Sequence, residues 1–174
     1  GADIPASGND CDSGPDPAPR GSVSEDDVRL ERDDVDATFG GRIRHLTHAA
    51  VGNERHLGVV IEMPDPGKRL APLHYHMREE EHALVLEGEV SLLLGEREFS
   101  MKPGDYVAFP AGHRVGHSFL NRGTGPCRYL MIGGHDPSDV CVYPRSGKMA
   151  VAGLNTSDCV FDMAARRSYW DGET

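Results

Sequence analysis

The 174-residue sequence predicts an all-β fold, a sandwich or a barrel made of short strands. From Gly40 onward, short apolar segments alternate with Gly, Pro and Asp, which is the pattern of strands joined by tight turns. The chain shows no alternation of strands with helices, and no long amphipathic helix precedes its last residues. Its length suits one domain with a tail.

The N-terminal residues differ from the rest in composition. The first forty carry 11 Asp and Glu against 3 Arg, so they hold eight of the ten net negative charges. Residues 1–22 are rich in Gly, Pro, Asp and Ser, and residues 23–36 read either as a short helix with Ser24 as N-cap or as a solvated charged segment. We expect residues 1–39 to form a disordered or loosely packed acidic arm.

Residues 40–145 contain the strand candidates, which share short length, apolar content and flanking turn residues. They are 41–48, 56–63, 70–76, 82–87, 89–94, 97–101, 106–109, 116–121, 127–133 and 139–143. Gly88 and Gly95 mark hairpin turns, where glycine tolerates positive φ. Residues 146–174 are an extension, with one or two helical turns in 160–167, and we expect Trp170 to pack on the barrel or on a partner chain.

Composition excludes several classes of function. An acidic chain lacks the clustered Lys and Arg that nucleic acid demands, so no nucleic-acid partner is expected. There is no run of 18 apolar residues, and therefore no membrane span is expected. The four cysteines show no CxxC spacing, which favours free thiols in a reducing compartment. No signal peptide is visible, although a removed leader stays open because the sequence begins at Gly1, and from the free thiols we expect a cytoplasmic location.

The residues with the most evident chemistry are two histidines one residue apart, followed by three consecutive glutamates. Side chains of a strand alternate between its faces, so His74 and His76 point the same way if this segment is extended. Imidazoles and a carboxylate form a ligand set for Zn, Mn, Fe, Ni or Cu. Strand parity with His76 favours Glu80 as the carboxylate, with Glu81 the alternative, and Glu79 reads as a solvated charge.

A second polar segment, residues 104–121, offers two further imidazoles, His113 and His117. Both segments carry spaced motifs: Gly67-x6-His74-x-His76-x4-Glu81-x6-Gly88 and Gly104-x5-Pro110-x-Gly112-x4-His117-x3-Asn121. The pair resembles the two signature motifs of the cupin superfamily, whose members are jelly-roll barrels. The second motif departs from the family pattern, because four residues rather than two separate Gly112 from the histidine, and Val115 holds the usual ligand offset.

The resemblance implies a single-domain cupin barrel, a jelly roll or double-stranded β-helix, that holds one divalent transition metal per chain. The implied ligands are His74, His76, Glu81 and His117, since Gly88 and Asn121 follow Glu81 and His117 at the family intervals. Fe or Mn is favoured because three histidines and a glutamate suit octahedral geometry, and Ni, Zn and Cu remain open. The residues expected to wall the site are Val85, Leu92, Phe109, Phe119 and Leu130.

The later segments GHSFLN, RYLMIGG and YPRSGK resemble small bacterial single-domain cupins of unsettled activity. The implied function is a metal-dependent enzyme of oxygenase, decarboxylase, isomerase or lyase type, acting on a small organic molecule such as a carboxylate or sugar acid. The alternative is a non-catalytic, metal-dependent module that binds a small molecule or sugar. No general base is identifiable from the sequence. An edge-to-edge homodimer is expected, because small jelly rolls leave an exposed strand.

Overall fold

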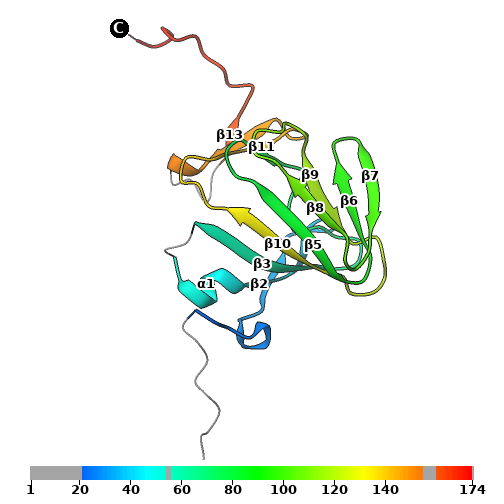
Figure 1. Cartoon of the computed structure of the whole chain (residues 1–174). Helices are drawn as coiled ribbons and strands as arrows, with labels where there is room; N and C mark the ends of the chain where they lie inside the picture. Colours follow the sequence, from blue (N-terminus) through cyan, green and yellow to red (C-terminus); the bar gives the residue numbers. More distant parts are fainter. Residues whose placement is uncertain (1–20, 54–55, 155–159, 174) are drawn as a thin grey trace, which may run out of the picture.

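The computed structural model describes residues 21–53, 56–154 and 160–173 as a β barrel with one short helix (Figure 1). The helix is α1 (Leu46–Val51), and single 3-10 turns lie at Glu25–Asp27 and Ala152–Leu154. The strands are β1 (Glu31–Asp34), β2 (Gly40–His45), β3 (Leu57–Pro64), β4 (Tyr75–His76), β5 (Glu81–Glu87), β6 (Val90–Leu94), β7 (Arg97–Met101), β8 (Tyr106–Phe109), β9 (His117–Leu120), β10 (Arg128–Gly134), β11 (Val140–Tyr143), β12 (Lys148–Val151) and β13 (Phe161–Asp162). The predicted all-β class is confirmed.

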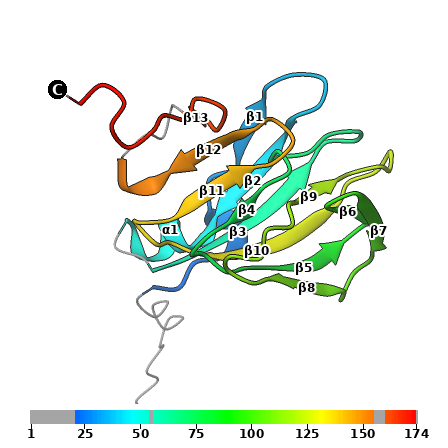
Figure 2. The same ribbon diagram turned by 90° about the horizontal axis from the view of Figure 1, so that it is seen from above.

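The strands form three sheets, and every strand pair is antiparallel. One sheet has six strands in the order β1-β2-β3-β10-β5-β8. The second has the order β13-β12-β11-β4, and the third has the order β7-β6-β9. An isolated bridge between His74 and His117 joins the second sheet to the third. Figure 2 shows the same strands with the molecule seen from above.

The barrel interior is filled by one cluster of buried side chains from β5 to β10. Its members are Ala83, Val85, Val90, Leu92, Met101, Phe109, Phe119, Cys127, Tyr129 and Met131. Four of the five predicted wall residues belong to this cluster, but Leu130 does not. Side chains alternate along β10, and its inward positions are taken by Tyr129 and Met131, so Leu130 faces the other way.

The acidic N-terminal segment contacts the six-stranded sheet from Glu25 onward. Val28 is buried, and Arg44 donates to its carbonyl oxygen at 2.7 Å. Arg128 binds both carboxylate oxygens of Glu25 at 2.5 and 2.6 Å. Ser24 does occupy an N-cap position, although it caps a single 3-10 turn and its side chain makes no cap hydrogen bond. Residues 1–20 of the arm predicted for residues 1–39 lie outside the described residues.

Three local predictions are wrong. The end of the predicted strand 41–48 is the start of helix α1, and the predicted strand 70–76 pairs continuously only at Tyr75–His76. Pro72 lacks a backbone donor, which disfavours a continuous ladder there. The helical turns predicted for 160–167 are replaced by β13 and turns.

Within the described ranges, no helix is long and apolar enough for a membrane span.

The C-terminal residues extend away from the barrel in both views (Figures 1 and 2). Tyr169 and Trp170 are 84% and 75% exposed, so the predicted packing of Trp170 on its own barrel is wrong. The two rings contact each other, with centroids 4.7 Å apart. Packing on a partner chain stays a prediction.

Candidate metal centre

Three histidines and a glutamate from three sheets meet inside the barrel. We refer to His74, His76, Glu81 and His117 as the histidine–glutamate cluster. His76 lies on β4, Glu81 begins β5 and His117 begins β9, so each of the three sheets contributes a side chain. His74 precedes β4, and its backbone exchanges hydrogen bonds with that of His117, at 3.1 and 2.8 Å. The cluster therefore lies where the sheets join.

The ring nitrogens of the cluster converge on one carboxylate oxygen. The distances to Oε2 of Glu81 are 3.6 Å from Nε2 of His74 and 3.5 Å from Nε2 of His76. Nε2 of His117 is 2.9 Å from the same oxygen. The side chain of His117 is 2% exposed, whereas those of the other three residues are between 13% and 15% exposed. Donor atoms of His74, Glu81 and His117 all lie within 4.8 Å of one another, and His76 approaches this group through its 3.5 Å contact with Glu81.

Three atoms of this cluster have no hydrogen-bond partner within the described chain: Nδ1 of His117, and the facing pair formed by Oε2 of Glu81 and Nε2 of His117. Although they lie 2.9 Å apart, their relative orientation is not that of a hydrogen bond. Buried polar atoms without partners are costly, and they are rare unless an ion or water satisfies them. A divalent metal ion bound by the imidazole and carboxylate donors would satisfy both atoms of the facing pair, so the residues present fit a metal.

The histidine rings are held from behind by their second nitrogens or by ring stacking. Nδ1 of His76 bonds to the carboxylate of Asp139 at 2.6 Å, and Nδ1 of His74 bonds to the carbonyl oxygen of Pro72 at 2.8 Å. Each contact directs Nε2 into the cluster and favours the tautomer that can coordinate. The ring of His117 instead stacks on Phe109, with centroids 3.7 Å apart.

The cluster shifts the acidity of its members. Burial favours the neutral carboxyl group, but the three histidines outweigh it and lower the pKa of Glu81 below its usual range. Burial lowers the pKa of His117. Burial alone would also lower the pKa of His76, yet Cys141 and the neighbouring carboxylates raise it to about 10. A metal ion bound to His76 must therefore displace a proton.

The structure separates the alternatives that the sequence left open. Glu80, which strand parity favours, is exposed and binds Nε2 of His82 at 2.8 Å, outside the barrel. Residues 77–80 are not extended, so the parity of β4 does not carry through to the glutamates. His113 is exposed and lines only a narrow opening beside His76 and His117. The side chains brought together are those of Glu81 and His117.

Glu79, predicted as a solvated charge, is largely buried instead. One of its oxygens accepts the Asp136 backbone N–H at 2.7 Å, and the other lies 3.5 Å from Nδ1 of His76. Burial raises the pKa of Glu79. The irregular turn 77–80 folds Glu79 under the loop that carries Asp136, which is a tertiary contact and leaves no mark in local sequence spacing.

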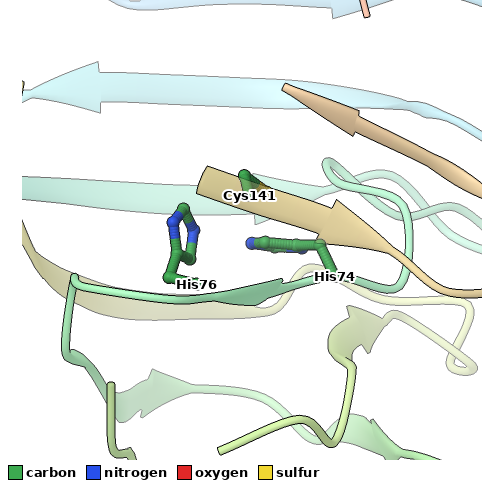
Figure 3. A group of neighbouring side chains, drawn as sticks. All are labelled: His74, His76 and Cys141. Carbon is green, nitrogen blue, oxygen red and sulfur yellow. The ribbon is translucent and has the colours of Figure 1, made fainter. Parts of the chain in front are cut away.

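Two neighbours of the cluster were not anticipated from sequence. Asp139 is buried, and besides His76 it accepts the backbone N–H of Arg78 at 2.8 Å. Cys141 lies opposite His76 in the β11–β4 pair, and its sulfur lies within 4.8 Å of ring nitrogens of both His74 and His76. Figure 3 shows the two rings below the strand that carries Cys141. Asp139 and Cys141 stand two residues apart, and that spacing is the one available signal.

The cluster borders an inner cavity of about 100 Å³ on its barrel side. Six polar residues line this cavity: Glu62, His74, Glu81, His117, Ser118 and Tyr129. Tyr129 donates to Oε2 of Glu62 at 2.5 Å. Asn121, by contrast, binds the backbone of Pro64 and Gly125 at a loop and is structural.

Both the sequence and the fold of the chain are similar to those of known proteins. The profile of the Cupin domain family (Cupin_2) matches residues 60–133, which span β3 to β10. No curated protein matches the sequence.

Solved structures give broader coverage. A protein from Acidithiobacillus ferrooxidans, named as a proposed sugar phosphate isomerase, is 28% identical with a TM-score of 0.74, over 86% of this chain and 96% of that chain. A sugar phosphate isomerase of the cupin superfamily from Silicibacter pomeroyi is 26% identical with a TM-score of 0.71, over 86% and 98%. A predicted oxalate decarboxylase from Thermotoga maritima is 22% identical with a TM-score of 0.54, over 65% and 97%, and shares the fold. Residues 60–133 thus match a Cupin domain, and the chain has the all-β barrel fold of these cupin structures.

Proposed function

We propose that the chain is a metal-dependent cupin enzyme in which the histidine–glutamate cluster holds one divalent transition metal ion. The observation that carries this proposal is the convergence of three Nε2 atoms on Oε2 of Glu81, at 2.9 to 3.6 Å. Its support is the unpartnered state of Glu81 Oε2 and His117 Nε2 among the described residues. Three imidazoles and one carboxylate favour Fe or Mn, with Ni, Zn and Cu as further candidates.

When bound, such an ion would act as a Lewis acid on a substrate carbonyl or hydroxyl oxygen. The protein residues around it supply orientation and a partly closed cavity. Asp139 and the Pro72 carbonyl orient two rings, while Phe109 stacks on the third. Preorganised polar groups in a site with little water have stronger electrostatic effects than in solution.

For the substrate class, we propose a phosphorylated sugar or a related hydroxy-carbonyl compound, and isomerisation as the reaction. The support is the similarity to two proteins named as sugar phosphate isomerases, each across 86% of this chain. A cleft of about 260 Å³ is lined by Leu73 and Gly116, which precede His74 and His117 of the cluster in the sequence. Arg114 and Arg145 also line it, along with Glu96, and two guanidinium groups suit an anionic substrate.

The first test is the metal content of protein purified without a histidine tag, by elemental analysis. We expect about one transition metal ion per chain, and we expect His76→Ala to lose it because a ligand is removed and the shell opened. His113→Ala is the matched control and should keep its metal, because its side chain is exposed at the rim. Sub-stoichiometric metal together with unchanged stability after chelation would contradict the proposal.

The second test is turnover of a panel of phosphorylated aldoses and ketoses, sugar acids and simple carboxylates by metal-loaded protein. Interconversion of an aldose phosphate and a ketose phosphate would support the isomerase. Tight binding of one of these compounds without turnover would instead support the binding module. Oxygen uptake with a carboxylate would favour oxygenase chemistry and overturn the isomerase.

We further propose a cytoplasmic homodimer. The support for the dimer is the pair of exposed aromatic residues Tyr169 and Trp170, in the segment that extends from the barrel. The support for the location is the free thiols of Cys127 and Cys141. Burying two large aromatic side chains against a second copy is favourable, since each covers a large apolar area. Light scattering of the full chain and of a Trp170→Ala variant tests this; a monomer at micromolar concentration would contradict it.

A further inference from the structure

A carboxylate that takes no part in the histidine–glutamate cluster faces the same interior. Glu62 lies on β3, and its side chain points into the barrel with that of Val60, which packs on the core cluster. Its hydrogen-bond partner is Tyr129, which is 1% exposed and donates at 2.5 Å. Glu62 and Tyr129 are also opposite one another in the β3–β10 pair.

Glu62 shares the inner cavity with the cluster. Glu62, His74, Glu81 and His117 all line the same space of about 100 Å³. A water molecule occupies about 30 Å³ in the liquid, so the cavity admits roughly three waters or a fragment of two to three carbon atoms. That size suits the reacting end of an open-chain sugar, and the remaining carbon atoms of the sugar would lie outside this cavity.

A carboxylate at this position is costly for the fold. Burial raises the pKa of Glu62, and the hydrogen bond from Tyr129 offsets part of that rise. An apolar residue would fit the adjacent cluster of Phe119, Tyr129 and Met131 better, because buried ionisable groups rarely repay their desolvation. A carboxyl group with a raised pKa beside a reaction cavity is a suitable proton carrier.

We propose that Glu62 is a catalytic residue that carries the substrate proton in isomerisation, and that Tyr129 is a positioning residue that holds its carboxylate. The proposal rests on the proposed function and adds the group that moves the proton. It requires a substrate with a hydroxyl group on the carbon next to a carbonyl, which is the chemistry shared by aldoses and ketoses.

The step conserves atoms and electrons. An oxygen of Glu62 takes the proton from C2 of the aldose, and the electron pair of that C–H bond forms the C1–C2 double bond of an enediolate. The hydroxyl proton moves from O2 to O1. The carboxylic acid of Glu62 then returns its proton to C1, and the carbonyl group forms at C2. No oxidant or reductant is needed, and Glu62 ends as the carboxylate.

The test follows deuterium from solvent into the substrate. Full-length protein loaded with Mn²⁺ is incubated in D₂O with glucose 6-phosphate, ribose 5-phosphate, mannose 6-phosphate and arabinose 5-phosphate, and the C1 and C2 hydrogens are followed by proton NMR. We expect wild type to incorporate deuterium and Glu62→Gln to lose about 100-fold or more in that rate. Glu87→Gln, an exposed carboxylate at the end of β5 in the same sheet, is the matched control and should behave as wild type.

Folding and metal content are measured on every variant. Glu62→Gln keeps the shape of the side chain and an oxygen that accepts from Tyr129, so it should retain wild-type metal content and a normal melting transition. If it fails to fold, Glu62→Asp is the second variant, because it keeps the charge but withdraws the carboxyl group by one methylene. We expect it to slow incorporation at least about tenfold, with a larger effect on kcat than on KM.

The outcomes separate this inference from the proposed function. Turnover that continues at the wild-type rate in Glu62→Gln overturns the role of Glu62 and leaves the isomerase standing. Turnover without deuterium incorporation, unaffected by Glu62→Gln, indicates direct transfer between the two carbons and also overturns the role. Absence of both turnover and exchange in metal-loaded wild type overturns both, while metal content still tests the metal site.

Discussion

Asp139 orients one histidine of the candidate centre through a hydrogen bond to its ring nitrogen Nδ1. Its Oδ2 bonds Nδ1 of His76 at 2.6 Å, and its Oδ1 accepts the Arg78 backbone N–H at 2.8 Å. The carboxylate therefore fixes both the orientation of the ring and the turn that follows it. Such partners of metal-binding histidines contribute about 10- to 100-fold in metal affinity.

We predict that Asp139→Asn weakens metal affinity by about 10- to 100-fold while leaving the fold intact. The amide can still bond to the ring, but it lacks the charge that favours the imidazole proton on Nδ1. Competition titration with a chromophoric chelator measures the dissociation constant. Asp105→Asn, in the turn after β7, is the control, and equal affinities of both variants would exclude the role of Asp139.

Glu62 gives a prediction about pH. Its raised pKa means that the folded protein retains a proton that the unfolded chain has already lost above its usual value of about 4.5. Wild-type stability therefore falls as the pH rises from that value through the raised pKa, by about 1.4 kcal/mol for each pH unit between the two. Glu62→Gln removes this loss.

Chemical denaturation at about pH 4.5, 6 and 8, after metal is removed with a chelator, measures the free energy of unfolding of wild type and of Glu62→Gln. We expect Glu62→Gln to gain stability relative to wild type as the pH rises, with the smallest difference at the acid end. Glu87→Gln, at the exposed end of β5, is the control for the loss of a carboxylate. A difference for Glu62→Gln that is constant across the range would show that the pKa of this carboxyl group is not raised by folding.

At the scale of elements, the environment of β3 explains why the sequence does not identify Glu62 as a residue of the barrel interior. Leu57, Val59 and Ile61 form the apolar face of that segment, yet Ile61 is buried toward the outer side of the sheet. Helix α1 lies beside β3 there, and the N-terminal segment contributes the buried Val28 (Figure 1). Both faces of β3 are therefore covered, and the face with the polar residue is the one inside the barrel.

The β5–β6 turn explains the last glycine of the first motif. Gly88 has φ of +70°, and a Cβ placed there would overlap the Pro126 carbonyl oxygen. The turn thus presses against the segment that leads into β10. Glycine is required there both by its backbone angle and by the absence of space.

We predict that Gly88→Ala lowers the melting temperature by roughly 6 to 12 °C. An L-residue in the left-handed region costs about 1–2 kcal/mol, the overlap adds further strain, and about 1 kcal/mol shifts a domain of this size by 2–4 °C. Gly104→Ala is the control, because Gly104 has φ of +90° but nothing within 4 Å of the added Cβ. It should lose less than half as much in calorimetry, and equal losses would mean that contact with Pro126 is unimportant.

At the scale of the whole molecule, features carried by local spacing were predictable. Turn residues between short apolar segments gave the all-β class and eight of the strands close to their bounds, and two spaced motifs gave the cupin barrel. The motifs also named the four side chains that the fold brings together. Spacing succeeds here because each motif residue lies near a turn, where the number of residues fixes the geometry.

Features set by tertiary contact were not predictable from one sequence. Asp139 meets His76 across 63 positions, and Tyr129 meets Glu62 across 67. Each of these polar residues lies in an ordinary strand or loop context, so only the fold identifies its partner. The same holds for β12, which exists because β11 offers it an edge.

The way in which the sheets join leads to a final prediction. Strand β4 pairs only with β11 among the described strands, and the second sheet meets the third through the backbone bridge at His74 and His117. A metal ion in the cluster would link all three sheets. Binding to the native state stabilises it by about 2.7 kcal/mol at one hundred times the dissociation constant, so the melting temperature should rise by roughly 5 to 11 °C.

The gain should also be uneven across the molecule. Local opening of the second sheet breaks the cluster, whereas fraying of α1 does not, so metal should slow hydrogen exchange most in β4, β11 and β12. Exchange measured by mass spectrometry with Mn²⁺, and again after EDTA, tests this, with His76→Ala as the variant that should not respond. Equal slowing in α1 and in β11 would mean that the ion acts on the barrel as a whole, and no slowing anywhere would mean that it does not bind across the sheets.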